Sequence, residues 1–431
     1  MYLLNIRIQN IRSLRSLKWN MASPRMAPGW HVVLGDNGSG KSSFIRSVAL
    51  ALVGPTEAVA LRQSWNDWLK KDVDIGGISL EISRDYDLDT YSGRGIPRHS
   101  LLPIRLDFIR DEWGYAELST QPLTVDPKRH VWGGNSGWFS ASYGPFRRFS
   151  GGNKDYEKMF YSNPRLAPHL SAFGESIALS ESIQWLQDLK FKELEEPHSS
   201  ESRLLSQITK FVNQRGFLPN NTKLEKVSSA GVHFKDGNGC EVAVEELSDG
   251  YRSVLSMTFE LIRQMSKAYH GGEIFSEDSA KITVPGVVLI DEVDAHLHPS
   301  WQRKIGLWFR EHFPAVQFIV TTHSPLVCQA ASVGTVFRLP APGSDEKADF
   351  VTGTDLDRLL YGNILEAYST ELFGEGTTRS EESRKRLERL AELNIAEMER
   401  ELTVAEREEQ ERLRATLPTT AHALTGAIGA K

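Results

Sequence analysis

The sequence predicts an α/β fold that is built on a sheet of parallel strands. Three apolar runs support this prediction, at Val32–Leu34, Val287–Ile290 and Phe318–Thr321. Apolar runs of strand length suit strands that are covered on both faces, as in parallel sheets. A helix-like stretch at 300–312 separates the last two runs, so strand, helix and strand alternate along the chain.

The first third of the chain predicts the remaining strands of the fold. Residues 1–34 alternate apolar and polar positions and end in the first apolar run, which predicts an edge hairpin followed by a buried strand. A glycine-rich turn at 35–40 leads into a helix over 42–52. Further strands are expected at 78–83 and 104–109. We therefore expect a mixed core sheet beside an antiparallel edge sheet.

The second half of the chain is expected to be richer in helices. Residues 156–216 place apolar side chains at helical spacing and predict a helical lobe. Residues 224–247 predict a short hairpin with its turn at 236–239, and a helix is expected from about 250 to 268. From Arg379 onward, charges of both signs surround spaced leucines, which predicts one or two solvated amphipathic helices.

These patterns divide the chain into four expected parts. Residues 1–340 form a head, into which the helical lobe is inserted at about 156–216. Residues 341–378 connect the head to a charged amphipathic helical tail over 379–417, and residues 418–431 are expected to be disordered.

Composition excludes several classes of protein. The chain has 50 Lys and Arg against 56 Asp and Glu, a net charge of −6, which argues against a binder that holds nucleic acid by bulk charge. Two cysteines, Cys240 and Cys328, predict neither a disulfide framework nor a zinc module. The most apolar stretch, Ser47–Leu61, is interrupted by Pro55 and is too short for a membrane span. We expect a cytoplasmic protein without a membrane partner.

The strongest motif is the phosphate loop, which we define as Gly35–Ser42 and which fits the pattern G-x-x-x-x-G-K-[ST]. An ordinary glycine turn is the alternative, but a strand before the motif and a helix after it favour phosphate binding. Lys41 is expected to reach the β- and γ-phosphates, and the Ser42 hydroxyl is expected to bind Mg²⁺. The residues expected to contact nucleotide here are Gly35, Asn37, Gly38, Ser39, Gly40, Lys41, Ser42 and Ser43.

A second motif ends the apolar run at 287–290 with two carboxylates. Asp291 is expected to hold Mg²⁺, and Glu292 is placed to polarise the attacking water as a general base. The alternative is an acidic strand end that faces solvent. The phosphate loop in the same chain favours the catalytic interpretation.

The order of motifs resembles the ABC-type ATPases of the SMC/RecF branch. The phosphate loop is followed by Leu247–Arg252 (LSDGYR), by Leu289–Pro299 (LIDEVDAHLHP) and by Thr321–Pro325 (TTHSP), so the resemblance spans roughly residues 1–340. Within that branch the chain is similar to ATPase subunits of bacterial antiphage systems: the Septu ATPase, retron-associated ATPases and OLD-like ATPases without the nuclease domain. Two further segments, Tyr143–Arg148 and Ser182–Leu186, are similar to elements of those proteins.

The resemblance implies a head-to-head dimer that encloses two ATP molecules, with a catalytic Lys41, Glu292 and His323. Ser248 and Gly250, in the signature segment Leu247–Arg252, would contact the γ-phosphate bound to the other subunit. His323 would contact the γ-phosphate, and Asp294 would communicate across the dimer. The familiar signature reads Leu-Ser-Gly-Gly-Gln; here residue 249 is Asp and residue 251 is Tyr, so we expect the Asp249 side chain to face away from phosphate. Gln121 is the candidate for the glutamine that senses Mg²⁺.

We therefore expect an ATP-hydrolysing, Mg²⁺-dependent subunit that dimerises around ATP and controls a separately encoded effector, a nuclease or toxin, in antiphage defence. The alternatives are a RecF-like DNA-binding repair ATPase, a nucleotide-gated scaffold and a transporter nucleotide-binding subunit. Nucleic acid stays open as a partner.

Three features of the sequence each allow two interpretations. The glycine- and aromatic-rich segment 126–155 suits a packed lobe better than nucleic-acid contact, and its Arg147 and Arg148 could instead contact nucleotide or the partner subunit. The charged tail suits either a partner contact or a solvated surface. His296 and His298 suit a loop better than a metal site, because no further ligand lies at matching spacing.

Overall fold

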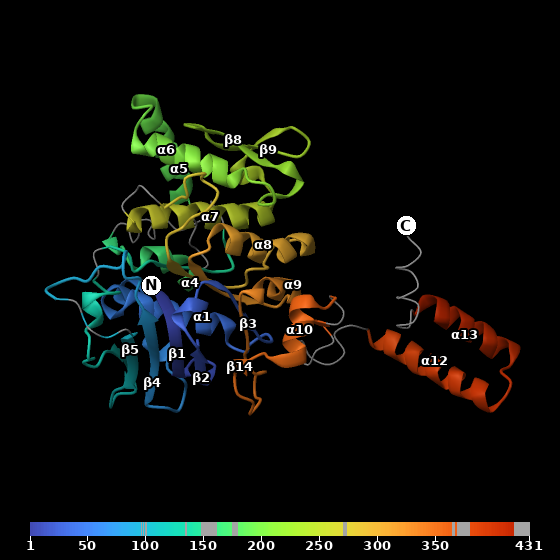
Figure 1. Ribbon diagram of the computed structural model, residues 1–431. Coiled ribbons are helices and arrows are strands. Elements are labelled where there is room, and N and C mark those ends of the chain that lie inside the picture. Colours follow the sequence, from blue (N-terminus) through green and yellow to red (C-terminus); the bar gives the residue numbers. More distant parts are fainter. Residues whose placement is uncertain are drawn as a thin grey trace. The chain divides into compact units, whose positions relative to one another are not determined.

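The computed structural model describes residues 1–95, 97, 99, 101–133, 136–147, 162–174, 180–269, 274–363, 367–368 and 380–417. The chain forms two compact units, Met1–Gly362 and Asn363–Lys431. Figure 1 labels the elements of both units.

A six-stranded mixed sheet forms the centre of the first unit. Its strand order is β14-β13-β3-β12-β11-β7, and every neighbouring pair is parallel except β13 and β14. The predicted mixed core sheet is therefore confirmed, and each of the three apolar runs lies on a strand at its centre. The strands are β3 (Gly29–Leu34), β7 (Ser140–Tyr143), β11 (Gly286–Ile290), β12 (Val316–Thr322), β13 (Gly334–Arg338) and β14 (Asp349–Phe350).

A five-stranded antiparallel sheet has the order β2-β1-β4-β5-β6. The predicted N-terminal hairpin is confirmed, but only β2 lies at the sheet edge, because β1 pairs with β2 on one side and β4 on the other. Alternation of apolar and polar residues gives this sheet one buried face and one open face. Its strands are β1 (Tyr2–Ile11), β2 (Leu14–Asn20), β4 (Ile75–Ser83), β5 (Leu101–Arg110) and β6 (Ala116–Ser119).

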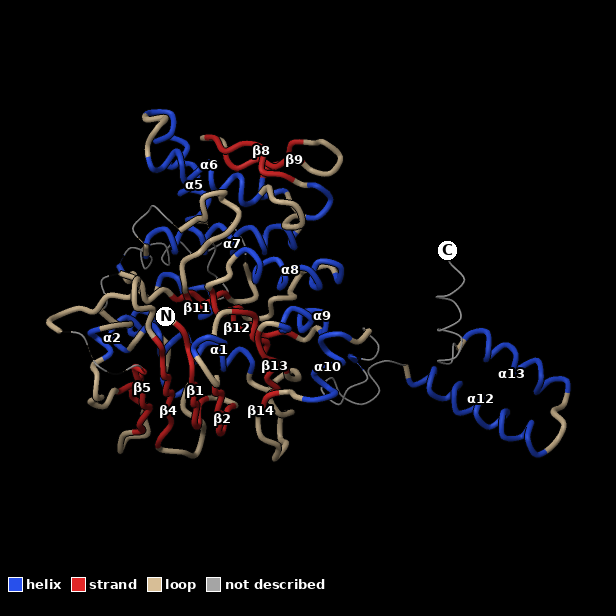
Figure 2. The backbone as a smooth tube through the Cα atoms, in the orientation of Figure 1, coloured by secondary structure: helices blue, strands red, loops and turns tan. Residues whose placement is uncertain are grey.

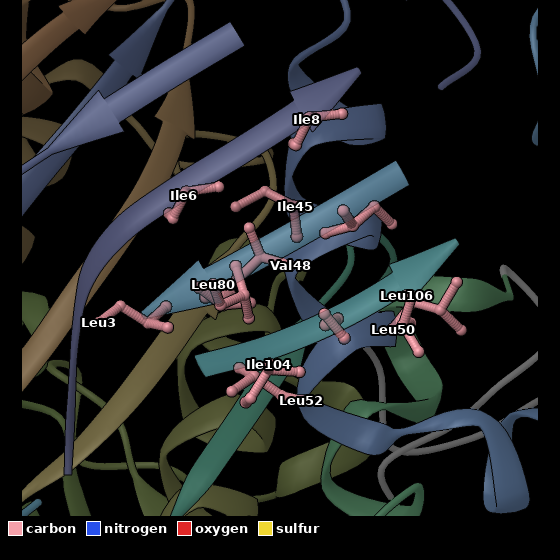
Figure 3. Close-up of a cluster of buried hydrophobic side chains, with 14 of the residues drawn as sticks. Leu3, Ile6, Ile8, Ile45, Val48, Leu50, Leu52, Leu80, Ile104 and Leu106 are labelled. Carbon is pink, nitrogen blue, oxygen red and sulfur yellow. The ribbon is translucent and has the colours of Figure 1, made fainter. Parts of the chain in front are cut away.

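Helix α1 (Lys41–Val53) lies between the two sheets, and nearly all of its residues are buried. Figure 3 shows Ile45, Val48, Leu50 and Leu52 of this helix meeting side chains of β1, β4 and β5. The run Val48–Val53 is apolar on all sides of the helix and is stable only when it is covered on all sides. The apolar cluster therefore holds the start of α1, and with it the phosphate loop, against the end of β3.

Helices α7 (Asp249–Ala268) and α8 (Pro299–His312) cover the other face of the central sheet (Figures 1 and 2). Aromatic side chains make this contact: Trp30 of β3 stacks on Phe309 of α8, with ring centroids 6.4 Å apart, and packs against Phe318 of β12 at 5.4 Å. The helices predicted at 250–268 and 300–312 are thus confirmed. Two further helices follow in this unit, α9 (Pro325–Cys328) and α10 (Gly353–Tyr361).

Beyond α7 lies a lobe made of two helices and a small sheet (Figure 1). The helical pattern predicted within 156–216 is confirmed over its described part. The expected hairpin is present with its turn at 236–239, but an additional strand, β8, extends it to three antiparallel strands. The elements are α5 (Glu181–Glu195), α6 (Ser200–Val212), β8 (Lys223–Ser228), β9 (Gly231–Lys235) and β10 (Glu241–Ala243); two short helices, α2 (Pro55–Ala58) and α4 (Leu170–Phe173), lie elsewhere in the unit.

The second unit contains a helical hairpin of α12 (Glu381–Glu399) and α13 (Val404–Thr416). The predicted amphipathic helices are therefore confirmed as two. Arg389 pairs with Glu409 and Arg414 with Glu397, both at 3.1 Å, so opposite charges join the two helices. Exposed pairs of this kind stabilise only weakly, and buried leucines, including Leu390 and Leu393, supply the apolar contact.

The expected domain boundaries remain a prediction. In the structure the first unit continues past residue 340, because β14 pairs with β13 and α10 follows it within the same unit. The expectation of disorder concerns 418–431, which lie outside the described residues.

Across the described ranges, no single helix combines the length and apolar character needed to span a bilayer. One pair, Lys41–Val53 with Pro55–Leu61, passes by length and composition when taken together, but bends by 116°.

Candidate functional site

The phosphate loop connects the end of β3 to the start of α1. Gly38 and Gly40 have left-handed backbones with φ of 80° and 99°, which glycine adopts without steric cost. The loop leads directly into the start of α1, whose first backbone N–H groups have no partner within the helix and suit an anion, as at other helix starts. The buried Ser39 hydroxyl has no hydrogen-bond partner among the described residues.

Lys41 lies at the first position of α1 with its side chain folded along the loop. Its Nζ donates to the carbonyl oxygens of Gly35 at 2.8 Å and Asp36 at 3.0 Å. Burial lowers the pKa of Lys41, and the negative charges of Glu292 and Asp291 oppose that shift. The lysine of the phosphate loop therefore lies within electrostatic reach of both predicted catalytic carboxylates.

Asp291 and Glu292 follow β11 directly and are held by the neighbouring strand. Thr321 of β12 donates from its Oγ1 to Asp291 Oδ1 at 2.6 Å and accepts from the Glu292 N–H at 2.8 Å. Glu292 has a φ of 46°, an unfavourable conformation for a residue with a Cβ atom. Such conformations persist where surrounding contacts enforce them, and they concentrate at functional sites.

His323 follows the last residue of β12. Burial lowers its pKa, as does the positive charge of Lys41, while Asp294 and Glu292 oppose the shift. The imidazole is therefore biased toward its neutral form and lies near the same charged groups as Lys41. Thr322 donates a short hydrogen bond to Asp294 Oδ1, which ties the loop after Glu292 to the loop that carries His323.

The strand order explains why these residues meet. Strands β3, β12 and β11 are neighbours and parallel, so their carboxyl ends lie at the same edge of the sheet. Ligands of open α/β sheets bind at this edge. The phosphate loop, His323 and the Asp291–Glu292 pair follow those three strands, so the structure brings together the site residues predicted within one subunit.

The signature segment lies at the start of α7. Ser248 precedes the helix and is exposed, and its side chain makes no capping hydrogen bond. Gly250 is buried, and a Cβ atom there would come within 2.8 Å of the His296 carbonyl oxygen, so only glycine allows this close packing. In the described structure, neither Ser248 nor Gly250 forms a hydrogen bond with the phosphate loop of the same subunit.

The two unusual residues of the signature segment have local partners. Asp249 forms a short ion pair with Arg252, one helical turn away, so its charge is partly neutralised within α7. Tyr251 packs against Trp301 with ring centroids 5.4 Å apart, and its hydroxyl donates to the Pro219 carbonyl oxygen at 3.0 Å. Tyr251 therefore anchors the signature segment to α8 and to the lobe.

Arg147 is a site residue whose contacts the sequence does not reveal. The sequence leaves open a contact with nucleotide or the partner subunit; among the described residues, the guanidinium hydrogen-bonds to the loop that carries Asp291 and Glu292. Its Nη1 donates to the Asp291 carbonyl oxygen and its Nη2 to the Glu292 carbonyl oxygen, each at 3.0 Å. Burial lowers the pKa of Arg147 to about 10, against the charge of Asp291. Thr321 and Thr322 were also missed, although their position just before His323 is a usable signal.

The remaining candidates have other surroundings. Gln121 follows β6 of the antiparallel sheet and borders a cavity of about 390 Å³ with Arg105 and Asp126. His298 caps α8 by accepting from the Ser300 N–H, and no cluster of metal-ligating side chains is found among the described residues.

The described part of 126–155 is a packed region. Trp132 and Trp138 are buried and donate from Nε1 to the Ala51 and Thr90 carbonyl oxygens, as the packed-lobe interpretation requires. Arg148 lies outside the described residues.

Two protein-family models match the chain. One, described as "AAA domain, putative AbiEii toxin, Type IV TA system", matches residues 156–329; the other, described as "AAA domain", matches residues 5–121. The second match contains the phosphate loop. The first contains the signature segment, Asp291, Glu292 and His323, so the two models together cover the predicted site.

Comparison with known proteins gives relatives that are named for Septu and retron systems. The chain is 24% identical, over 85% of its length, to a Septu protein PtuA of Bacillus mycoides (strain KBAB4), and the match covers 45% of that protein. It is 33% identical, over 28% of its length, to the probable ATPase of retron Ec83 of Escherichia coli, and that match covers 22% of the relative. The chain thus spans less than half the length of these curated relatives.

Among solved structures, an Smc head bound to the C-terminal winged-helix domain of ScpA aligns with 81% of this chain and 98% of that chain, at 14% identity and a TM-score of 0.48. The motif order, the geometry at the sheet edge and the sequence relatives together show that the chain is similar to AAA domains, to the Septu protein PtuA and to the probable ATPases of retrons.

Proposed function

We propose that the chain binds ATP at the phosphate loop and hydrolyses it in a Mg²⁺-dependent reaction. The observation that supports this most strongly is the meeting of Lys41, Asp291, Glu292 and His323 at one edge of the central sheet. These groups are a phosphate-binding cation, a metal-binding carboxylate, a general base and a γ-phosphate contact, which phosphoryl transfer to water requires.

The residues present fit Mg²⁺. Ser42 offers a hydroxyl oxygen at the start of α1, and Asp291 is 2% exposed and accepts a hydrogen bond from Thr321 at its Oδ1. Oxygen ligands from one carboxylate and one hydroxyl, completed by phosphate and water, suit this ion. When bound, Mg²⁺ would neutralise charge on the phosphate oxygens.

Each side chain then has one task in the proposed reaction. Lys41 and the N–H groups of the phosphate loop hold the β- and γ-phosphates, and His323 contacts the γ-phosphate. Glu292 orients a water molecule for attack on the γ-phosphorus and accepts its proton. The left-handed backbone of Glu292, held by Thr321, sets the direction from which the carboxylate approaches.

Replacing Lys41 with alanine is expected to weaken ATP binding by about tenfold to 100-fold, since it removes charge-assisted hydrogen bonds to phosphate. Isothermal titration with a slowly hydrolysed ATP analogue measures the change. Lys304→Ala removes an exposed lysine of α8 and serves as the matched control. Equal affinity of the Lys41→Ala variant and wild type would place the nucleotide elsewhere.

We further propose that two subunits enclose ATP between the phosphate loop of one and the signature segment of the other. The exposed Ser248 hydroxyl and the first N–H groups of α7 suit a γ-phosphate that approaches from outside the subunit. Asp249 is compatible with this arrangement because Arg252 pairs with its carboxylate.

Replacing Ser248 with arginine is expected to abolish ATP-dependent dimerisation, because a long side chain would fill the space where the partner's nucleotide binds. ATP binding by the monomer should stay within about twofold, since its own phosphate loop is intact. Light scattering with and without ATP, in a Glu292→Gln background that retains nucleotide, measures the change. Ser229→Arg, on an exposed turn of the lobe, is the control. An ATP-dependent dimer of the Ser248→Arg variant would refute the trans arrangement.

The wider role follows from the relatives and is likewise a proposal. We propose a cytoplasmic subunit whose ATP-driven opening and closing controls a separately encoded effector, such as a nuclease or toxin, in antiphage defence. The similarity to Septu and retron ATPases supports this role, and the free cysteines Cys240 and Cys328 suit a reducing compartment. Co-purification with the product of the neighbouring gene tests it.

A further inference from the structure

Arg147 is 5% exposed and directs all of its described hydrogen bonds to neutral oxygens. Besides the carbonyl oxygens of Asp291 and Glu292, it reaches the Gly144 carbonyl oxygen at 3.2 Å and the Ser253 hydroxyl at 2.9 Å. Across the described ranges, no carboxylate lies within ion-pair distance of its guanidinium. Burying a cation is unfavourable unless its hydrogen bonds are satisfied. Arginine satisfies them here because its planar guanidinium directs several N–H donors in a fixed geometry.

The four oxygens belong to three separate parts of the site. Gly144 follows β7, Asp291 and Glu292 follow β11, and Ser253 lies on α7, five residues after Ser248. Arg147 therefore joins the helix that begins at the signature segment to the loop that carries the general base. Ser253 is itself buried, with 1% of its surface exposed, so this contact is shielded from water.

Glu292 is held from both sides of its backbone. Thr321 Oγ1 accepts from its N–H, and Arg147 Nη2 donates to its carbonyl oxygen. Its left-handed φ of 46° needs such support, because that conformation is unfavourable for a residue with a Cβ atom. Loss of either hydrogen bond would let the Glu292 backbone relax and change the direction of its carboxylate.

We propose that Arg147 is a positioning residue that couples the signature helix α7 to the Glu292 backbone. The inference rests on the proposed function, because it assumes that Glu292 activates water and that nucleotide of the partner subunit contacts Ser248. Since α7 is a continuous helix of 20 residues, a shift of its start is transmitted to Ser253 and through Arg147 to Glu292. Contact of the signature segment with the partner's nucleotide would thereby position the Glu292 carboxylate.

The test compares two serines of the same helix. Ser253→Ala removes the hydroxyl that Arg147 contacts, whereas Ser256→Ala removes an equally buried hydroxyl that donates only to the Ser253 carbonyl oxygen of its own helix. We expect Ser253→Ala to lower kcat for ATP hydrolysis about tenfold with KM within about twofold of wild type, and Ser256→Ala to leave both unchanged. Arg147→Lys, which keeps the charge but loses the fork, is expected to lower kcat about 100-fold.

A second measurement separates positioning from loss of fold and does not depend on catalysis. Hydrogen exchange of residues 291–296 should quicken in Arg147→Lys and Ser253→Ala, while exchange in β3 and α1 stays as in wild type. If wild type hydrolyses no ATP, the proposed function fails, and the exchange result still decides whether Arg147 holds the Glu292 loop. Unchanged exchange at 291–296, or equal kcat for the two serine variants of an active enzyme, would overturn the coupling.

Discussion

Replacing Glu292 with glutamine is expected to lower kcat for ATP hydrolysis by about 10²-fold or more, because general bases contribute 10²- to 10⁴-fold to catalysis. Glutamine has nearly the same size and can still hydrogen-bond water, but it cannot accept a proton. ATP binding should persist, since Lys41 and the phosphate loop are unchanged. Phosphate release under saturating ATP and Mg²⁺ measures kcat, and equilibrium titration measures binding.

Glu311→Gln is the control for this substitution. Glu311 lies near the end of α8 and is exposed, so the same chemical change there should leave phosphate release within about twofold of wild type. An ATP-dependent dimer that outlasts the wild-type dimer should accompany Glu292→Gln. Unaltered phosphate release by Glu292→Gln would remove the general-base assignment and leave a nucleotide-gated scaffold as the better description.

Replacing Gly334 with alanine is expected to destabilise the first unit by about 3–5 kcal/mol, a large part of the 5–15 kcal/mol typical of folded domains. Gly334 begins β13 opposite Trp30 of β3, with a φ of 153°. A Cβ atom there would lie 1.9 Å from the Trp30 carbonyl oxygen and 2.6 Å from its carbonyl carbon. To relieve this overlap, the parallel strands β3 and β13 would have to move apart, and β3 ends at the phosphate loop.

Gly343→Ala is the matched control for backbone conformation. Gly343 has a φ of 81°, but no atom lies within 4 Å of the position of an added Cβ, so only the conformational cost of about 1–2 kcal/mol is expected. Denaturant unfolding measures the free energy of unfolding of both variants, and the difference between them gives the cost of the steric overlap at Gly334. A Gly334→Ala variant as stable as Gly343→Ala would show that the β3–β13 pairing can relax.

The candidate catalytic groups within one subunit are predictable from the sequence because each follows a recognisable element. The phosphate loop needs its glycines and lysine in consecutive order, and Asp291 and Glu292 end an apolar strand. The elements themselves were predictable for the same reason: the buried strands β3, β11 and β12 are continuous apolar runs, and α7 and α8 show helical periodicity. These signals are local in the sequence, so they can be recognised before the fold is known.

Contacts between distant segments were not predictable in this way. Arg147 lies in a glycine- and aromatic-rich segment that has no periodicity, and its partners are backbone carbonyl oxygens, which carry no sequence signal. The pairing of Asp249 with Arg252 could have been inferred from the i, i+3 spacing of the two residues. The contacts of Tyr251 with Trp301 and Pro219 could not have been inferred, because those residues are far from Tyr251 in the sequence.

The sequence by itself determined the α/β class, the phosphate loop and the identity of the candidate catalytic carboxylates, because residue type and spacing along one chain encode strands, glycine turns and helix starts. The tertiary structure alone decided which strands are neighbours, and therefore that β12 lies between β3 and β11 and brings Thr321 and His323 to the site. It also decided that Glu292 adopts a left-handed backbone between Thr321 and Arg147. Strand order and backbone strain depend on packing between segments that are distant in the sequence, since Thr321 is 29 residues from Glu292 and Arg147 is 145 residues from it. Local patterns carry no information over such separations.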